Sequence, residues 1–285
     1  MTPTLAGVSE RDVQGLLSLI QAECGIVLAR AKYPMIESRL RKRTRALGME
    51  SLAEYCRYVV SPAGREAEAP YLVDAITTHK TDFFREPAHF DFLIARAVPE
   101  LAEKYGSGVR RPLTVWSSAC STGEEPYTLA MVLSEYAAAD ERGLFRFSIA
   151  ATDVSRGVIE TARAAIYPEA ATAAIPEVLR RRYLLRSRDR ERGLVRVAPA
   201  IRAAVEFRAL NLMESGYGFD EPLDIVFCRN VMIYFDRAAQ ERVLRKIVAC
   251  LRPGGFLFMG HAESLAGFDL PLTQVVPTVH RRRNG

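Results

Sequence analysis

The spacing of apolar residues changes near residue 77, and this change divides the chain into two parts. In the first part apolar residues recur at helical spacing, as in the stripe formed by Val13, Leu16, Leu17 and Ile20. Ser9 with Asp12 and Ser51 with Glu54 resemble capping boxes, and a helix is expected between them from about Pro34 to Leu47. We therefore predict a small all-helical domain over residues 1–76.

Within this first part, residues 61–70 are rich in proline, glycine and alanine. Such a composition is typical of a loop. A loop is therefore predicted there, followed by a short helix over residues 71–76.

From residue 77 onward, strand patterns alternate with helical patterns. After a helix over 87–104, strands are expected near residues 113–117, 146–152, 205–209, 224–228 and 255–260, and helices near 125–138, 155–165 and 237–251. This alternation predicts an α/β domain over residues 77–285, with a doubly wound, mostly parallel sheet. The alternation breaks over about residues 167–204, which we interpret as a small inserted β-subdomain. The final run, 274–280, is predicted as a single antiparallel strand.

The segment LTVWSSACSTGEEPY, residues 113–127, reads as a buried strand, a turn of small residues and a helix. Open α/β sheets build ligand crevices from such units. The helix begins with Glu124 and Glu125, which would repel a pyrophosphate at a position where phosphate-binding helices present amide groups. The segment therefore favours an unphosphorylated nucleoside ligand that carries positive charge, and S-adenosylmethionine is the obvious candidate.

Other polar residues follow the later predicted strands, where they would face the same crevice. Asp153 is placed to accept hydrogen bonds from ribose hydroxyls, although it is also placed to cap the following helix. Arg229 and Asn230 end the strand in IVFCRNVMIYFD, with Tyr234 one turn later, and Asn211 follows the preceding strand. Alternatively, Asn230 caps a turn and Tyr234 packs in the core.

The segment TTHKTDFFREPAHF, residues 77–90, precedes the sheet and combines polar groups with two aromatic residues. Phe83 and Phe84 are expected to pack in the core. Thr81 and Arg85 are the candidates for ligand binding. The competing interpretation is that Arg85 merely belongs to the start of a helix at Pro87.

Composition narrows the classes of protein that fit. No run approaches the ~18 apolar residues of a membrane span, and no secretory signal pattern is present at the N-terminus. The five cysteines are widely spaced, so a reduced, cytoplasmic chain is expected. The four histidines show no paired spacing, so no metal site is expected.

The net charge of +5 is less informative than its distribution. One predicted helix carries a basic run formed by Arg39, Arg41, Lys42, Arg43 and Arg45. This run is either a solvated face or a docking surface for an acidic partner. A nucleic-acid partner is disfavoured because no aromatic residues are interleaved with the run to stack on bases.

Taken together, these segments resemble the chemotaxis receptor methyltransferases (the CheR family), which methylate glutamate side chains of methyl-accepting chemotaxis proteins. The resemblance covers nearly the whole chain. It includes the helical first domain, the TTHKTDFFRE segment, WSSACSTGEEPY, ATD, GLVRV, NL, CRNVMIYFD and LRPGGFLFMGHAES. It implies a cytoplasmic enzyme that uses S-adenosylmethionine, releases S-adenosylhomocysteine and needs no metal. It also implies a monomer that acts on the helical cytoplasmic domain of receptors without inserting into the membrane.

The resemblance also assigns residues position by position. It implies cofactor contacts for Thr81, Arg85, Glu125, Asp153, Asn211, Leu212, Arg229 and Asn230. His79 stands where the family often has asparagine, and we include it among the cofactor-binding candidates. Arg85 and Tyr234 match residues beside the transferring methyl, and the basic run matches the receptor-docking helix.

Three other classes of protein compete with this interpretation. A methyltransferase of nucleic acid, small molecules or another acidic protein would share the crevice, and so would a scaffold that binds the cofactor without catalysis. A nicotinamide dehydrogenase fits worst, because the first turn lacks GxGxxG spacing. The expected reaction needs no general base, since a glutamate with a pKa of about 4.3 is already ionised at neutral pH.

Overall fold

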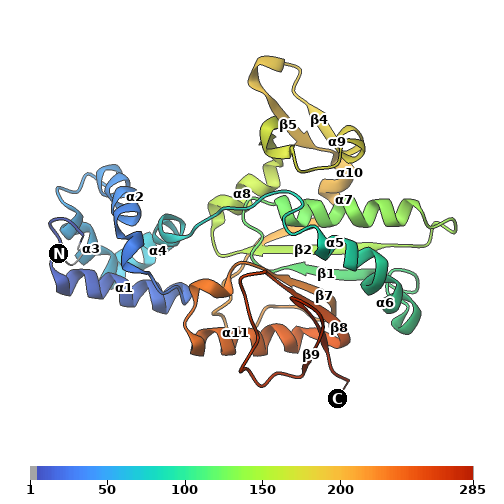
Figure 1. Cartoon of the computed structure of the whole chain (residues 1–285). Coiled ribbons are helices and arrows are strands. Elements are labelled where there is room, and N and C mark those ends of the chain that lie inside the picture. The colour runs from blue at the N-terminus through green and yellow to red at the C-terminus, as the bar shows by residue number, and fades with distance from the viewer. Residues whose placement is uncertain (1–4, 285) are drawn as a thin grey trace.

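Four α-helices form the N-terminal part of the chain, coloured blue to cyan in Figure 1. The computed structural model describes residues 5–284. The helices are α1 (Glu10–Cys24), α2 (Tyr33–Ala46), α3 (Leu52–Val60) and α4 (Pro62–Ile76), with a 3-10 turn, η1 (Arg30–Lys32), before α2. The Ser9 hydroxyl accepts a hydrogen bond from the Asp12 amide (3.1 Å), and the Ser51 hydroxyl accepts one from the Glu54 amide (3.2 Å). Both predicted capping serines are therefore confirmed.

The predicted loop over residues 61–70 is wrong, because this stretch forms most of α4. Ser61 caps the helix, with its hydroxyl accepting from the Gly64 amide (3.1 Å), and Pro62 lies in the first turn, where an N–H is not needed. Pro70 lies inside the helix, where proline ordinarily costs about 3 kcal/mol. Burial of one face, which carries Glu68 and Leu72, outweighs this local preference.

The remaining chain builds a seven-stranded sheet of order β6-β2-β1-β7-β8-β10-β9. Its first five strands are mutually parallel, and the last two are antiparallel to their neighbours. The bounds are β1 (Leu113–Ser117), β2 (Phe147–Asp153), β6 (Val205–Ala209), β7 (Leu223–Cys228), β8 (Leu251–Met259), β9 (Leu272–Val276) and β10 (Val279–Arg282). The predicted doubly wound, mostly parallel sheet is confirmed. From β1 the chain adds β2 and β6 on one side of the sheet, and it then crosses over to add β7 and β8 on the other side. The strand order therefore switches between β1 and β7, and such a switch point opens a crevice at the carboxyl ends of the strands.

The predicted single strand over 274–280 is wrong, because two antiparallel strands, β9 and β10, occupy this region. Pro277 and Thr278 separate them, and Thr278 has a positive φ of 64°. Pro277 has no N–H to donate to a ladder, so the chain turns there.

Helices cover both faces of the sheet, with α11 (Arg237–Cys250) on one face and α7 (Glu124–Ala138) on the other (Figure 1). The α7 side also carries α5 (Ala88–Phe92), η2 (Leu93–Ala97), α6 (Val98–Tyr105) and α8 (Arg156–Ala164). The segment η2 is π-helical, so the helix predicted over 87–104 is interrupted just before Pro99. The core on the α11 side continues into the N-terminal helices, which fixes those helices against the sheet.

A small antiparallel sheet of order β3-β5-β4 interrupts the main alternation and projects from it (Figure 1). Its strands are β3 (Ile166–Pro168), β4 (Leu184–Arg186) and β5 (Leu194–Val197). They are joined by η3 (Glu169–Thr172), α9 (Glu177–Tyr183) and η4 (Arg190–Arg192), and α10 (Pro199–Ala203) leads back to the main sheet. The small inserted β-subdomain predicted over about residues 167–204 is therefore confirmed.

Candidate active site

A cleft lies at the carboxyl ends of β1, β2, β6 and β7, at the switch point of the sheet. Its volume is about 1040 Å³ including the open mouth. The residues predicted for the cofactor and for catalysis all line it, although they come from distant parts of the chain: His79, Thr81, Arg85, Glu125, Asp153, Asn211, Leu212, Arg229, Asn230 and Tyr234. The topology therefore brings these ten positions into one site.

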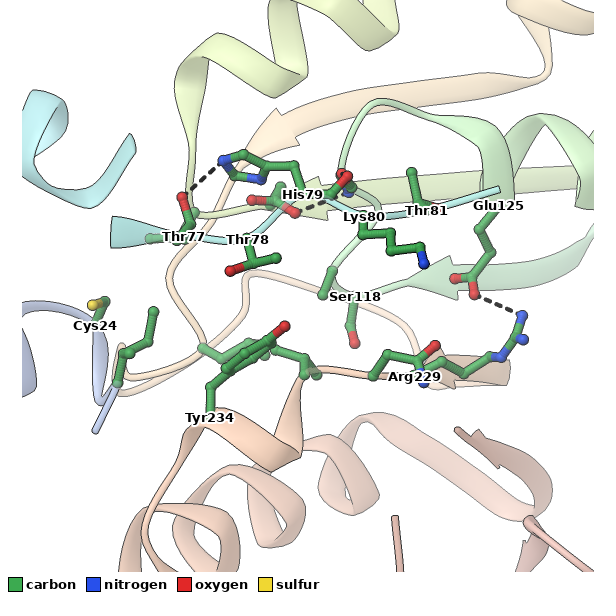
Figure 2. A pocket seen from close by; sticks show the side chains of 18 of the residues that line it. Cys24, Thr77, Thr78, His79, Lys80, Thr81, Ser118, Glu125, Arg229 and Tyr234 are labelled. Atoms are coloured by element: carbon green, nitrogen blue, oxygen red, sulfur yellow. Dashed lines mark hydrogen bonds and ion pairs between the residues drawn. The ribbon is translucent and has the colours of Figure 1, made fainter. Parts of the chain in front are cut away.

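Figure 2 shows two opposite walls of this cleft. The extended segment from Thr77 to Thr81 forms one wall, and Arg229 and Tyr234 lie on the other. The ion pair between Glu125 and Arg229 closes one end. Elongated clefts lined by a few placed polar groups are typical of nucleoside sites.

Arg229 is the centre of a buried network. Its side chain is 2% exposed and lies 3.0 Å from a carboxylate oxygen of Glu125 and 3.0 Å from one of Glu86. It also donates a hydrogen bond to the Arg85 carbonyl (2.6 Å). A buried guanidinium is stable only when its charge is paired, and the two carboxylates provide that pairing here. Its two terminal nitrogens contact these three acceptors, while its Nε has no hydrogen-bond partner among residues 5–284.

The backbone around Arg85 is held in an unusual conformation. Phe84 and Glu86, on either side of Arg85, both have positive φ values, 53° and 58°. Non-glycine residues keep such conformations only where surrounding contacts enforce them, and they concentrate at functional sites. Burial acts to raise the pKa of Glu86, but the guanidinium of Arg229 and the amide of His261 lower it below its usual value. The ionised Glu86 and Arg229 therefore anchor the turn that presents Arg85.

Asp153 ends β2 and accepts hydrogen bonds from the Ser121 amide (2.9 Å) and the Ser155 amide (3.0 Å). The alternative role of Asp153 as the cap of the next helix is wrong. Ser155 caps α8 instead, with its hydroxyl accepting from the Val158 amide (3.3 Å). Burial raises the pKa of Asp153, and the two amide hydrogen bonds oppose this shift.

The His79 ring lies 2.8 Å from the Thr77 hydroxyl, and its carbonyl accepts a hydrogen bond from the Ser121 hydroxyl (3.1 Å). Burial lowers the pKa of His79, while the charges of Asp153 and Asp74 oppose this change. The ring therefore belongs to the same polar cluster as Asp153, on the wall of the cleft (Figure 2).

The side chain of Asn211 forms hydrogen bonds with two other parts of the backbone. Its amide group donates to the Glu23 carbonyl, and its side-chain oxygen accepts from the Met213 amide (2.9 Å). Asn211 thereby ties the loop after β6 to the end of α1. Asn211 and the adjacent Leu212 both line the cleft.

Glu263 is a residue that sequence reasoning did not single out, although its motif, GHAES, had been noted. Its carboxylate accepts four backbone hydrogen bonds of 2.7–2.8 Å, from Asn230, Val231, Met232 and Gly260. The first three amides belong to the loop that carries Asn230, at a positive φ of 58°, and to η5 (Met232–Tyr234), whereas Gly260 directly follows β8. Gly260 is required at its position, since a Cβ there would lie 2.6 Å from the Asn230 side-chain nitrogen. Glu263 therefore shapes the wall that presents Asn230 and Tyr234.

The N-terminal helices also contribute to the cleft, which was not predicted. Cys24, Ile26 and Lys32 line it. The Val27 amide donates to the Tyr234 carbonyl (2.8 Å), and the Lys32 ammonium lies 4.5 Å from the centroid of the Tyr234 ring. Only the tertiary fold brings these residues to Tyr234, and no local signal marked them.

The basic run on α2 does not present one uniform face. Arg39 donates to the carbonyls of Ala75 and Thr77, and Arg43 forms a buried pair with Glu68 (2.7 Å). Arg41, Lys42 and Arg45 are exposed. Two of the five predicted docking residues therefore hold α2 against the rest of the chain.

The charges of the cleft fit the ligand class expected from the sequence. Glu125 and Asp153 place two carboxylates on its walls, and no glycine-rich phosphate cradle faces them. Lys32, Lys80 and Arg85 line the same cleft, and the Lys32 ammonium lies against the Tyr234 ring. The arrangement suits a cationic nucleoside on the sheet side and a carboxylate that enters from the other side. Within residues 5–284, no helix is both long and apolar enough to cross a membrane.

Comparisons with known proteins agree over most of the chain. Residues 11–77 match the family model for the CheR methyltransferase all-alpha domain, and residues 79–279 match the CheR methyltransferase SAM binding domain. The chain is 37% identical over 282 residues to the chemotaxis protein methyltransferase of Escherichia coli, covering 98% of this chain and 93% of the relative. It is 38% identical over 272 residues to chemotaxis protein methyltransferase 2 of Pseudomonas aeruginosa, covering 95% and 93%. It is 34% identical over 275 residues to the chemotaxis protein methyltransferase of Borreliella burgdorferi, covering 96% of this chain and 95% of the relative.

Proposed function

The chain belongs to the CheR family of S-adenosylmethionine-dependent methyltransferases, and we propose that it methylates glutamate side chains of methyl-accepting chemotaxis receptors. The proposed products are glutamyl methyl esters and S-adenosylhomocysteine. One observation carries the proposal: Arg85 and Tyr234, together with Lys32 and Lys80, line the same cleft as the cofactor candidates. The positive charge of these lining residues supports binding of an acidic side chain near the methyl donor.

The cofactor fits the residues of the cleft. We assign Asp153, at the end of β2, to the ribose hydroxyls, and Glu125, which also pairs with Arg229, to the positively charged part of the cofactor. When bound, S-adenosylmethionine supplies a methyl group on a sulfonium, which passes to a carboxylate oxygen without release of a proton. The segment from Thr77 to Thr81 would cover the ligand from the opposite wall.

The acceptor carboxylate is already ionised at neutral pH, with a reference pKa of about 4.3, so no general base is required. The chain must instead strip water from this carboxylate and align it. We assign these tasks to Arg85, which would pair with one carboxylate oxygen, and to Tyr234, which would orient the group through its hydroxyl. Positioning and exclusion of water then supply most of the rate.

Transfer of tritiated methyl from S-adenosylmethionine to a purified receptor cytoplasmic fragment tests the reaction. Base-labile incorporation on protein is expected, with none on RNA or DNA. Arg85→Ala and Tyr234→Phe should each lower kcat about 100-fold, the scale expected when a reacting group is misplaced. Calorimetry should show nearly unchanged cofactor affinity for Tyr234→Phe. Normal turnover in both variants would disprove the assigned roles.

We further propose that the N-terminal domain, residues 1–76, docks the receptor through Arg41, Lys42 and Arg45, which are the exposed members of the basic run. Changing these three residues to glutamine should raise KM for the receptor fragment about tenfold and weaken its salt dependence, with kcat nearly unchanged. A matched control changes three cations at the other end of the sheet, Lys104, Arg110 and Arg142. Equal effects in the two variants would contradict docking through α2.

The competing functions predict different results in the same assays. Transfer to nucleic acid or to unrelated acidic proteins alone would identify a different methyltransferase, and cofactor binding without any transfer would identify a scaffold. We propose that the enzyme acts as a cytoplasmic monomer, without nucleic acid, membrane insertion or metal in the reaction. Treatment with a chelator should therefore leave the transfer rate unchanged.

A further inference from the structure

Three side chains converge behind Arg229, outside the wall of the cofactor cleft. Glu86, His89 and His261 each offer one ligand atom, and these atoms lie within 4.8 Å of one another. One Glu86 carboxylate oxygen lies 3.5 Å from His89 Nδ1 and 3.8 Å from His261 Nε2. Tetrahedral zinc ligands at about 2.1 Å from the metal are about 3.4 Å apart. Small side-chain rotations would therefore bring the three atoms to the spacing of a zinc site.

The hydrogen bonds of His89 determine which ring nitrogen carries the proton. Nε2 lies 2.7 Å from the Thr278 hydroxyl oxygen, and that hydroxyl donates its own proton to the Pro277 carbonyl (2.6 Å). We assign the proton to Nε2 on this geometry, since a hydroxyl that donates to the Pro277 carbonyl accepts from Nε2–H and leaves the lone pair on Nδ1. A second partner that fixes the tautomer in this way is typical of metal-binding histidines.

The lone pair on His89 Nδ1 faces another acceptor. His89 is 2% exposed, and its Nδ1 has no hydrogen-bond partner among residues 5–284. The nearest polar atom on the Glu86 side is a carboxylate oxygen at 3.5 Å, whose other charged neighbour is the Arg229 guanidinium at 3.0 Å. Two buried acceptors at 3.5 Å repel each other unless a cation lies between them.

We propose that Glu86, His89 and His261 form a binding site for Zn²⁺ or a divalent ion of the same ligand preference. Two imidazoles and one carboxylate are a common set of zinc ligands, and one coordination position stays open. The site is separate from the proposed methyl transfer, which needs no metal.

Arg229 would compete with a bound ion for Glu86, and this competition connects the proposed metal site to the active site. Its guanidinium lies 3.0 Å from the same Glu86 oxygen that would bind the metal. A bound cation would compete for that oxygen and weaken the Glu86–Arg229 pair, so affinity is moderate and binding disturbs the turn that presents Arg85. Zinc should therefore inhibit methyl transfer; this consequence rests on the proposed function, whereas metal binding does not.

Metal binding is tested on the full, untagged chain after removal of metal, by titration with Zn²⁺ in competition with a chromophoric chelator. We expect one equivalent to bind. His261→Ala should weaken binding at least tenfold and should fold normally, since the imidazole is 60% exposed. His280→Ala, a half-buried histidine of β10 outside the cluster, is the matched control and should bind like the wild type. Absence of stoichiometric binding, or equal binding in the wild type and His261→Ala, would overturn the site.

The inhibitory role is tested in the same variants with the receptor-fragment assay. Zinc should lower the transfer rate of the wild type and of His280→Ala, and a chelator should restore it, while His261→Ala should resist. Cofactor affinity measured without zinc should be equal in all three. Inhibition that persists in His261→Ala would refute the link to this cluster.

Discussion

Glu263 offers a sharp test of how the active-site wall is built. One carboxylate oxygen accepts from the amides of Val231 and Met232, and the other accepts from those of Asn230 and Gly260. Glu263→Gln keeps the shape of the side chain but replaces one oxygen with an NH₂ group. Two hydrogen bonds to the backbone are then lost, and the two N–H groups of the glutamine amide face two backbone N–H groups.

The loss of folding stability in Glu263→Gln can be estimated from these hydrogen bonds. A hydrogen bond to a charged group contributes about 1.5–3 kcal/mol. Loss of two predicts roughly 3–6 kcal/mol of destabilisation, a large share of the 5–15 kcal/mol typical of a domain. The loop that carries Asn230 and Tyr234 should loosen as well. A shift of about 1 Å there would lower kcat/KM about 100-fold.

Urea unfolding measures the stability change, followed by the fluorescence of Trp116, the single tryptophan, which is fully buried. Calorimetry and the methyl-transfer assay measure cofactor affinity and rate. Glu241→Gln, on the exposed surface of α11, is the matched control and should change stability by less than about 0.5 kcal/mol. If Glu263→Gln behaved like this control in all three measurements, the loop would not depend on the carboxylate and the reasoning would be refuted.

Other residues give further predictions. Asp153→Ala should raise the cofactor Kd at least tenfold by calorimetry, because the proposed ribose acceptor is lost, and a wild-type Kd would exclude that contact. His79→Asn, which introduces the residue common in the family, should keep the Kd within about threefold, and a larger loss would show that the imidazole itself is needed. Burial acts to raise the pKa of Asp224, but hydrogen bonds from Arg111 and the Thr114 amide lower it overall. This carboxylate therefore stabilises the fold above its unfolded-state pKa of about 3.9, and the contribution is lost as pH falls through the lower folded-state value. Asp224→Asn should cost about 3–5 kcal/mol at pH 7 and should flatten the acid limb of stability measured by urea unfolding from pH 7 to 3.

Local sequence was sufficient for most elements of the fold. The alternation of buried strands and amphipathic helices after residue 77 predicted the parallel sheet, because strand and helix periods differ enough to be read directly. Prediction from local sequence failed at residues 61–70, where proline and glycine suggested a loop but the packing of Glu68 and Leu72 stabilises a helix. It also failed at the last strand, where the turn at Pro277 depends on which edge of the sheet is available.

The sequence by itself determined which residues following the strands line the cleft, because parallel strands all end at one edge of the sheet and their following residues must meet there. Only the tertiary structure decided what those residues touch. It placed Arg229 between Glu86 and Glu125, set Glu263 under the loop of Asn230, and joined the N-terminal helices to Tyr234. It also brought His261 to Glu86 and His89 across about 175 residues of chain. Contacts between distant segments depend on register and side-chain packing, which leave no periodic signal in a single sequence.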